Sequence, residues 1–229
     1  MRYRIEFGQS DANRLKAQKF RQKIFRDSEV GLDDDKFDAA SDHCLIFDKN
    51  NKDRLVLVFR SRTFSSMEDI LCSYSAQHYD LTKLSTLPFK PMEIGRLCID
   101  QKVSDPFLLL SAFKYLRSLV SSSRIDFIFG CTSFTGADNP RHLESLNSLE
   151  KNQLADSKFP IKKKSQSILD IKKEINNTVE NKTVKNGLPP LLKFYLSLGG
   201  KVSDHAVIDR DLDTLHVFTY IDLKGRKFN

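Results

Sequence analysis

The chain has no long hydrophobic run. No segment approaches the roughly 20 consecutive apolar residues that a helix needs to cross a bilayer. Its first residues, MRYRIE, also have no apolar stretch of the kind found in a signal peptide. These absences predict a cytoplasmic protein, either free in solution or peripheral on the inner face of the cytoplasmic membrane.

Metal-binding and disulfide patterns are also missing. The four cysteines are far apart, and no two of them form a C-x-x-C pair. This argues against a zinc knuckle and against a disulfide-rich secreted scaffold. The five histidines show no spacing typical of metal ligands, so the sequence predicts no metal site.

The composition suits a folded, basic protein. With 229 residues, 40% of them apolar, the chain can bury a full core, and we predict one domain over residues 1–229. The net charge of +7 predicts attraction to phosphates, anionic lipids or acidic proteins. A nucleic-acid-binding module is the alternative of a different class. It is disfavoured because the basic residues do not alternate with aromatics in a repeated pattern.

Hydrophobic periodicity predicts a mixed α/β sheet with helices on its faces. Three helices are predicted. The first begins at Ser10 or Asp11, the second is capped by Ser104 or Asp105, and the third begins at Leu188. The predicted strands cover residues 3–7, 44–47, 54–63, 93–100, 125–131, 206–208 and 215–223.

Residues 138–187 differ from the rest and are predicted to form an inserted polar segment. It contains three consecutive lysines, Lys162 to Lys164, and Ile168, Ile171 and Ile175 follow at the spacing of an amphipathic helix. Such a segment can lie on anionic lipid or face an acidic partner protein. The alternative is an ordinary solvated helix.

Ionic residues occur on one predicted strand just before a helix. Glu93 and Arg96 lie on the strand, and a helix follows at Ser104-Asp105-Pro106. The unpaired N–H groups of a helix start bind phosphate, and Lys102 lies beside them, although the Asp105 carboxylate would repel the phosphate. The arrangement favours acyl transfer from a phosphate-bearing thioester.

Several short motifs, taken in order, resemble a known family. They are Arg21 with Phe25, Phe37-Asp38-x3-Asp42-His43, Arg60, Glu93-x2-Arg96, and Leu188-Pro189-Pro190-Leu191-Leu192-Lys193. The chain resembles the bacterial L-ornithine N-acyltransferases of ornithine-lipid synthesis. That family belongs to the branch of the GNAT superfamily that uses acyl carrier protein. The resemblance runs from about Arg21 to Asp213 and is weak through the insertion.

This resemblance implies a fold and a reaction. The fold would be a GNAT-like, largely antiparallel central sheet with helices on both faces. The reaction would move a 3-hydroxyacyl chain from the phosphopantetheine of acyl carrier protein to the α-amine of ornithine, giving lyso-ornithine lipid. No separate cofactor is implied. Coenzyme A is a less favoured donor, because residues 101–106 lack the glycines of the usual GNAT pyrophosphate loop.

The nearest rival reading is an acyl-homoserine-lactone synthase, whose acceptor would be S-adenosylmethionine. The first half of the ornithine acyltransferase family is similar to these synthases. They typically carry tryptophans at the nucleotide site, whereas this chain has no tryptophan. The rival therefore ranks second.

The resemblance also implies roles for residues on the acceptor side. Glu93 is the candidate base, with Arg96 beside it, and an ion pair that fixes the sheet is their structural alternative. Ideal alternation places these two side chains on opposite faces, so joint action needs a bulge, which Gly95 permits. Candidate substrate-binding residues are Arg21, Asp38, Asp42 and Arg60. The aspartates would bind ammonium groups or be solvated, and Arg60 would pair with an aspartate or with the substrate carboxylate.

On the donor side, a backbone N–H near Cys98 or Ile99 is the candidate oxyanion donor. Lys102 and Ser104 would contact the phosphate. Cys131 and Thr132, near the end of a strand, would lie against the thioester arm. An acyl-cysteine intermediate on Cys131 is disfavoured, because the sequence places no evident base beside it.

Overall fold

The computed structural model describes residues 2–138, 142, 145, 146, 149, 153–171 and 187–224. The chain forms two compact units. Unit 1 contains residues 1–63 and 92–125, and unit 2 contains residues 64–91 and 126–229. No helix in the described part of the chain has the length and apolar character to span a membrane. The single domain over residues 1–229 stays a prediction.

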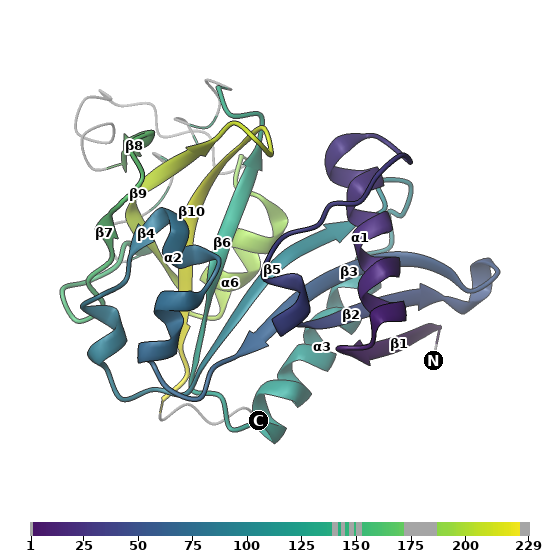
Figure 1. The fold of residues 1–229 in the computed structure, drawn as a ribbon, viewed down its shortest axis with the longest axis horizontal. Coiled ribbons are helices and arrows are strands. Elements are labelled where there is room, and N and C mark those ends of the chain that lie inside the picture. The colour runs from purple at the N-terminus through teal and green to yellow at the C-terminus, as the bar shows by residue number, and fades with distance from the viewer. Residues whose placement is uncertain are drawn as a thin grey trace. The chain divides into compact units, whose positions relative to one another are not determined.

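Unit 1 is a four-stranded antiparallel array with two long helices. Its strands pair in the order β1-β2-β3-β5. Figure 1 shows α1 and α3 on opposite sides of these strands. The elements are β1 (Tyr3–Gly8), α1 (Asp11–Arg26), β2 (Asp42–Asp48), β3 (Arg54–Thr63), β5 (Pro91–Ile99) and α3 (Pro106–Ser122), with short 3-10 turns at Asp38–Ala40 and Lys49–Asn51.

Helix α1 covers the first face of these strands because its apolar residues recur at helical spacing. The Ser10 side chain accepts a hydrogen bond from the Asn13 N–H and so caps the helix start. Ala17 packs against Leu45 and Phe47 of β2. On the opposite face, the ring of Tyr115 of α3 lies 5.6 Å from that of Phe7 on β1. We call these two faces the α1 face and the α3 face.

Unit 2 is also largely antiparallel. Four of its strands pair in the order β6-β10-β9-β8, and β4 pairs with β7 in a separate ribbon. The elements are α2 (Ser75–His78), β4 (Tyr79–Asp80), β6 (Phe127–Thr135), β7 (Lys162–Lys163), β8 (Ile168–Asp170), α6 (Pro190–Ser197), β9 (Lys201–Asp209) and β10 (Thr214–Asp222), with 3-10 turns at Glu68–Cys72 and Leu84–Thr86.

Aromatic rings make up much of the unit 2 core. Phe127 is fully buried and stacks on Tyr220 at 5.5 Å and on Phe159 at 5.7 Å between ring centroids. Phe129 stacks in the same way on Phe218 at 5.8 Å. Ring pairs of this kind add about 0.5–1.5 kcal/mol each beyond the area that they bury. They hold β6 firmly against β10.

The mixed α/β class predicted from the sequence is confirmed, but one local prediction is wrong. Ile168 begins strand β8, which pairs with β9, and is not part of an amphipathic helix. Ile171 is fully buried in the core, and Ile175 lies outside the described residues. Two of the three consecutive lysines form β7 rather than a solvated helix. Pairing with distant strands overrode the helical spacing here.

Candidate active site

Three arginines and three aspartates meet on the α1 face of unit 1, and we call them the arginine–aspartate cluster. Arg21 comes from α1, Arg60 from β3 and Arg96 from β5. The aspartates belong to the segment between α1 and β2, in which only Asp38 was a predicted site residue. The members are Arg21, Asp33, Asp35, Asp38, Arg60 and Arg96.

Asp38 lies at the centre of the cluster. Arg21 binds its two oxygens with two guanidinium nitrogens, at 3.0 and 2.6 Å, and Arg60 Nη1 donates to Oδ1 at 2.6 Å. Gln18 adds a further hydrogen bond of 3.0 Å. Only 1% of the side chain of Arg21 or Asp38 is exposed. The Asp38 carboxylate is thus surrounded by protein donors.

Asp35 links the other two arginines at the edge of the cluster. It accepts from Arg60 at 2.5 Å and from Arg96 at 2.9 Å. Its side chain is 17% exposed, more than the other aspartates of the cluster. Of the three carboxylates, Asp35 is therefore the one that solvent reaches best.

The cluster contains equal numbers of arginines and aspartates, and the arginines influence the pKa values of Asp38 and Asp35. Burial alone would raise the pKa of Asp38, but hydrogen bonds and attraction from Arg21, with help from Gln18 and Arg60, hold that pKa well below its usual range. Burial likewise acts to raise the pKa of Asp35, and Arg60 and Arg96 lower it overall. Both carboxylates are therefore ionised at neutral pH.

A bulge in β5 places Arg96 in the cluster. In the register with β3, Arg60 lies opposite Gly95, whereas Val58 lies opposite Cys98, so β5 holds an extra residue between these pairs. Arg96 has a φ of 52° there, a conformation that costs a non-glycine residue about 1–2 kcal/mol. The bulge that joint action of Glu93 and Arg96 would need is present, but Arg96, not Gly95, adopts the left-handed backbone.

Glu93 lies on the same face as the cluster. It is directly opposite Arg62 on β3, and Arg62 is two residues from Arg60, so their side chains share a face. Only 7% of Glu93 is exposed. Arg96 forms ion pairs with Asp35 and Asp33. Arg96 is a member of the cluster, and Glu93 lies beside it.

Asp42 lies on the other face, away from Asp38. It pairs with Ser61 on β3, one residue from Arg60, so its side chain points toward the α3 face. Tyr115 of α3 feels its charge, since burial raises the pKa of Tyr115 and nearby Cys44 and Asp42 raise it further. Burial also raises the pKa of Asp42 itself. The structure does not bring together the two aspartates that were predicted to share the ornithine ammonium groups.

The chain is similar to known acyltransferases. A family model described as an acetyltransferase (GNAT) domain matches residues 15–110, which include much of unit 1. Among solved structures, FeeM, an N-acyl amino acid synthase from uncultured soil microbes, is 11% identical with a TM-score of 0.49. That superposition covers 98% of this chain and 92% of FeeM.

Curated relatives match over nearly the whole length. The L-ornithine N(alpha)-acyltransferase of Brucella abortus is 28% identical over 98% of this chain and 79% of its own length. That of Rhodobacter capsulatus is 27% identical over 87% and 78%. Two further curated proteins of the same name are 26% and 28% identical, so the chain is similar to L-ornithine N(alpha)-acyltransferases over most of its length. This acyltransferase has the GNAT fold, as the sequence predicted.

At the α3 start of the acyltransferase, where a donor phosphate was predicted, a carboxylate already caps the helix. Asp105 accepts the Phe107 N–H at 2.9 Å, and Arg2 binds its other oxygen at 2.6 Å, with Tyr3 donating to the same oxygen. Burial, with the hydrogen bond to Asp105, raises the pKa of Tyr3 to about 12. An anion placed against this end would compete with Asp105.

The residues flanking this cap are on the surface. Lys102 and Ser104 are exposed, and the Lys102 N–H donates to the Asp100 side chain at 3.0 Å. Asp100 in turn pairs with Arg54. The two residues predicted to contact the phosphate, Lys102 and Ser104, are therefore exposed to solvent, whereas Asp105 already caps the helix terminus.

The backbone N–H groups of Cys98 and Ile99, the two candidates for the oxyanion donor of the acyltransferase, point toward opposite edges of β5. The Asp100 N–H donates to Val56 on β3, and successive N–H groups of a strand point to opposite edges. The Ile99 N–H therefore points away from β3, whereas the Cys98 N–H points toward it. The Cys98 side chain is buried against α1, and burial raises its pKa well above the usual range. Ile99 fits the predicted role, and Cys98 does not.

Two predicted donor residues of the acyltransferase belong to unit 2. Cys131 is half-buried on β6, and its Sγ donates to Ser75 Oγ at 3.5 Å. Thr132 is buried and accepts a hydrogen bond of 3.0 Å from Thr219 on β10. This hydrogen bond joins β6 to β10.

The sequence reading missed Asp33, Asp35 and Gln18 as parts of this site. Asp33 accepts from Arg21 Nε at 2.8 Å, although it looked like one of three consecutive loop aspartates. A usable signal was present: three arginines at apolar positions of three different elements require buried carboxylates as partners. The acidic loop is the nearest source of them.

Proposed function

We propose that this acyltransferase moves a 3-hydroxyacyl chain from acyl carrier protein to the α-amine of L-ornithine, giving lyso-ornithine lipid. One observation supports the acceptor above all. Four curated relatives, 26–28% identical over 86–98% of the chain, carry the name L-ornithine N(alpha)-acyltransferase. The net charge of +7 favours binding of an acidic carrier protein that presents the acyl thioester.

The chemistry needs a base and a stabilised oxyanion. The α-ammonium group of ornithine loses a proton to Glu93, directly or through a water, and the free amine attacks the thioester carbon. A carbon–nitrogen bond forms, and the carbonyl oxygen becomes an oxyanion near the Ile99 N–H. When the oxyanion collapses, the carbon–sulfur bond breaks, the attacking nitrogen loses its second proton to the departing pantetheine sulfur, and Glu93 releases the first proton to solvent.

The arginine–aspartate cluster has a positioning role in this proposal. Its arginines bind its own aspartates, so Arg21, Arg60 and Asp38 serve to hold the loop of residues 33–38 against β3 and β5. Asp35, at the exposed edge, is the carboxylate of the cluster best placed to meet an ammonium group of the substrate. The predicted substrate-binding role of Asp42 is not part of this proposal.

The reaction is tested directly with purified protein. It is incubated with a 3-hydroxyacyl carrier protein and with ornithine, lysine or S-adenosylmethionine, and free thiol is followed while the product is identified by mass spectrometry. We expect thiol release with ornithine and a product acylated at the α-amine. Thiol release only with S-adenosylmethionine would support a homoserine-lactone synthase. The absence of thiol release with every amine, together with salt-dependent retention on DNA, would contradict an enzyme.

A further inference from the structure

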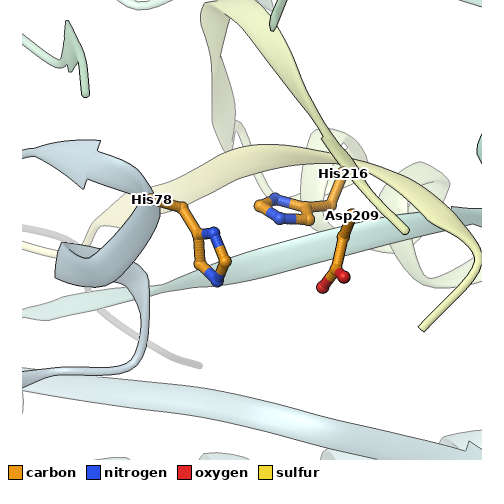
Figure 2. Close-up of side chains that lie close together, drawn as sticks. All are labelled: His78, Asp209 and His216. Carbon is orange, nitrogen blue, oxygen red and sulfur yellow. The ribbon is translucent and has the colours of Figure 1, made fainter. Parts of the chain in front are cut away.

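Two histidines and an aspartate meet in unit 2, outside everything described above. His216 lies on β10, Asp209 at the end of β9, and His78 at the end of α2. Each offers a ligand atom, and these atoms lie within 4.8 Å of one another. Figure 2 shows the three side chains gathered around a common space. We call them the His–Asp–His cluster. It was not visible in the sequence, because 131 residues separate His78 from Asp209.

His216 is the member that indicates a ligand. It is 2% exposed, and its Nε2 is buried with no hydrogen-bond partner among the described residues. A buried imidazole nitrogen without a partner is costly. Its other nitrogen, Nδ1, lies 3.1 Å from the Tyr79 hydroxyl, which also donates to the His216 carbonyl oxygen at 2.9 Å.

The Tyr79 hydroxyl contacts both Nδ1 and the carbonyl oxygen of His216 and has a single proton. When that proton goes to the carbonyl oxygen, Nδ1 is the donor in its contact with the hydroxyl oxygen, and Nε2 carries a lone pair. Metal-bound histidines are commonly oriented in this way by a hydrogen bond at the second nitrogen.

Asp209 is held in place while keeping an oxygen available. Its Oδ1 accepts the N–H groups of Asp211 and Leu212 at 3.0 and 3.2 Å, which fixes the turn between β9 and β10. The second oxygen is not needed for the turn. Asp209 and His78 are both only partly buried, so the cluster has an opening to solvent on their side.

We propose that the His–Asp–His cluster binds a divalent transition-metal ion, with Zn²⁺ as the preferred ion. Two imidazoles and one carboxylate suit Zn²⁺ and disfavour Mg²⁺ and Ca²⁺, which prefer oxygen ligands throughout. Around a tetrahedral Zn²⁺ with bonds of about 2.0–2.1 Å, ligand atoms lie roughly 3.3 Å apart. Rotation of the partly exposed His78 and Asp209 side chains brings the cluster to that size. Water or a further ligand takes the fourth position.

The bound ion would connect α2 to the β9–β10 hairpin and thereby stabilise unit 2. It would be the partner that His216 Nε2 lacks in the protein alone.

The test uses untagged full-length protein freed of metal by chelator. All proteins carry Cys72→Ser, because Cys72 is an exposed thiol that can itself bind Zn²⁺. Zn²⁺ binding is measured by calorimetry, Co²⁺ is added as a spectroscopic probe of tetrahedral coordination, and the melting temperature is recorded with and without Zn²⁺. The ligand variants are His78→Ala and Asp209→Asn. The second keeps a side-chain oxygen for the turn while it removes the charge.

Two neighbours provide matched controls. Gln77→Ala changes an exposed position beside His78 on α2, and Asp211→Asn removes a charge from the exposed turn next to Asp209. We expect one Zn²⁺ per chain, a raised melting temperature and a tetrahedral Co²⁺ band. The two ligand variants should weaken binding at least about tenfold, as is found when single groups of a metal site are removed. The controls should change it less than twofold.

Three outcomes would overturn the proposal. They are no Zn²⁺ binding by the parent protein, binding that His78→Ala and Asp209→Asn leave unchanged, and equal losses in ligand variants and controls. Because binding and melting are measured without any acyl donor, these outcomes are independent of the acyltransferase reaction.

Discussion

Asp38 and Asp42 are residues of one type, four positions apart, and the same role was predicted for both. Three donor side chains surround Asp38, and they keep its pKa low despite burial. Asp42 has no such partner among the described residues, lies on the opposite face and has a pKa raised by burial. A residue's chemical role therefore depends on the side of the sheet on which its side chain lies, and chain spacing across a loop does not determine this.

Glu93→Gln tests the proposed base. Because the amide cannot accept the ammonium proton, we expect kcat/KM to fall about 10²–10⁴-fold, the usual contribution of a general base. The fold should survive, since the change keeps the size and hydrogen-bonding shape of the side chain. Thiol release is measured from pH 6 to 9, roughly the range in which an amine acceptor gains its free form.

The matched control for this variant is Glu6→Gln on β1. Glu6 belongs to the same unit and forms ion pairs with Arg4 and Lys16 near the surface. Its loss should leave kcat/KM within about twofold, because surface pairs contribute at most about 1 kcal/mol to stability. Rates equal to those of the parent enzyme at every pH would remove Glu93 from the mechanism.

At the scale of elements, β5 shows what the sequence could and could not give. Alternation predicted that Glu93 and Arg96 need a bulge to act together, and the bulge is present. At this bulge, Arg96 forms ion pairs with Asp35 and Asp33. Sequence patterns predicted the strand well, but the partners of Arg96 lie in an earlier loop, and Asp35 is 61 positions away. Periodicity carries no information about such partners.

The helix prediction for the segment around Ile168 was wrong for a related reason. Its isoleucines fit a helix by spacing, yet residues 168–170 complete the edge of β9 as β8. Local helical propensity is weak compared with burial and with a row of backbone hydrogen bonds. By contrast, α1, α3 and α6 were predictable, because caps and prolines mark their starts in the sequence itself.

Asp38→Asn tests whether the cluster holds the loop in place. Removing one partner leaves the buried guanidinium of Arg21 undercompensated, so we expect a loss of about 3–5 kcal/mol in the free energy of unfolding at neutral pH. Since the pKa of Asp38 is lower in the folded than in the unfolded protein, its stabilisation is full above the unfolded pKa of about 3.9. It is lost as the pH falls further, so the difference between variant and parent should shrink only in strong acid.

Asp34→Asn is the control for this measurement. Asp34 is exposed in the same loop and accepts a hydrogen bond of 2.6 Å from Gln18. Its replacement should cost less than about 1 kcal/mol, as for other surface polar groups. Urea unfolding of both variants between acid and neutral pH provides the comparison. A cost for Asp38→Asn as small as that of the control would show that the cluster does not support the fold.

At the scale of the whole molecule, the net charge of +7 and the amphiphilic product of the proposed reaction together favour binding of the protein to an anionic membrane surface. The structure changes how the lysine-rich run would take part. Lys163 pairs with Asp170 at 2.6 Å, and Lys164 donates to the Ala76 carbonyl at 2.6 Å. Lys162 is exposed on β7 and is the lysine of this run best placed to meet lipid phosphates.

We therefore expect the protein to sediment with vesicles of anionic phospholipid and not with neutral phosphatidylcholine vesicles. Binding should be lost in 1 M salt, where screening acts over about 3 Å. Lys162→Gln should weaken it about fivefold, since a lysine near the surface contributes about 1 kcal/mol. Lys114→Gln, on the exposed side of α3, removes the same charge elsewhere. Equal weakening by both variants would mean that overall charge drives binding without a specific face. A greater loss for Lys114→Gln would place the membrane contact on α3, and binding to neither vesicle would exclude the membrane as a partner.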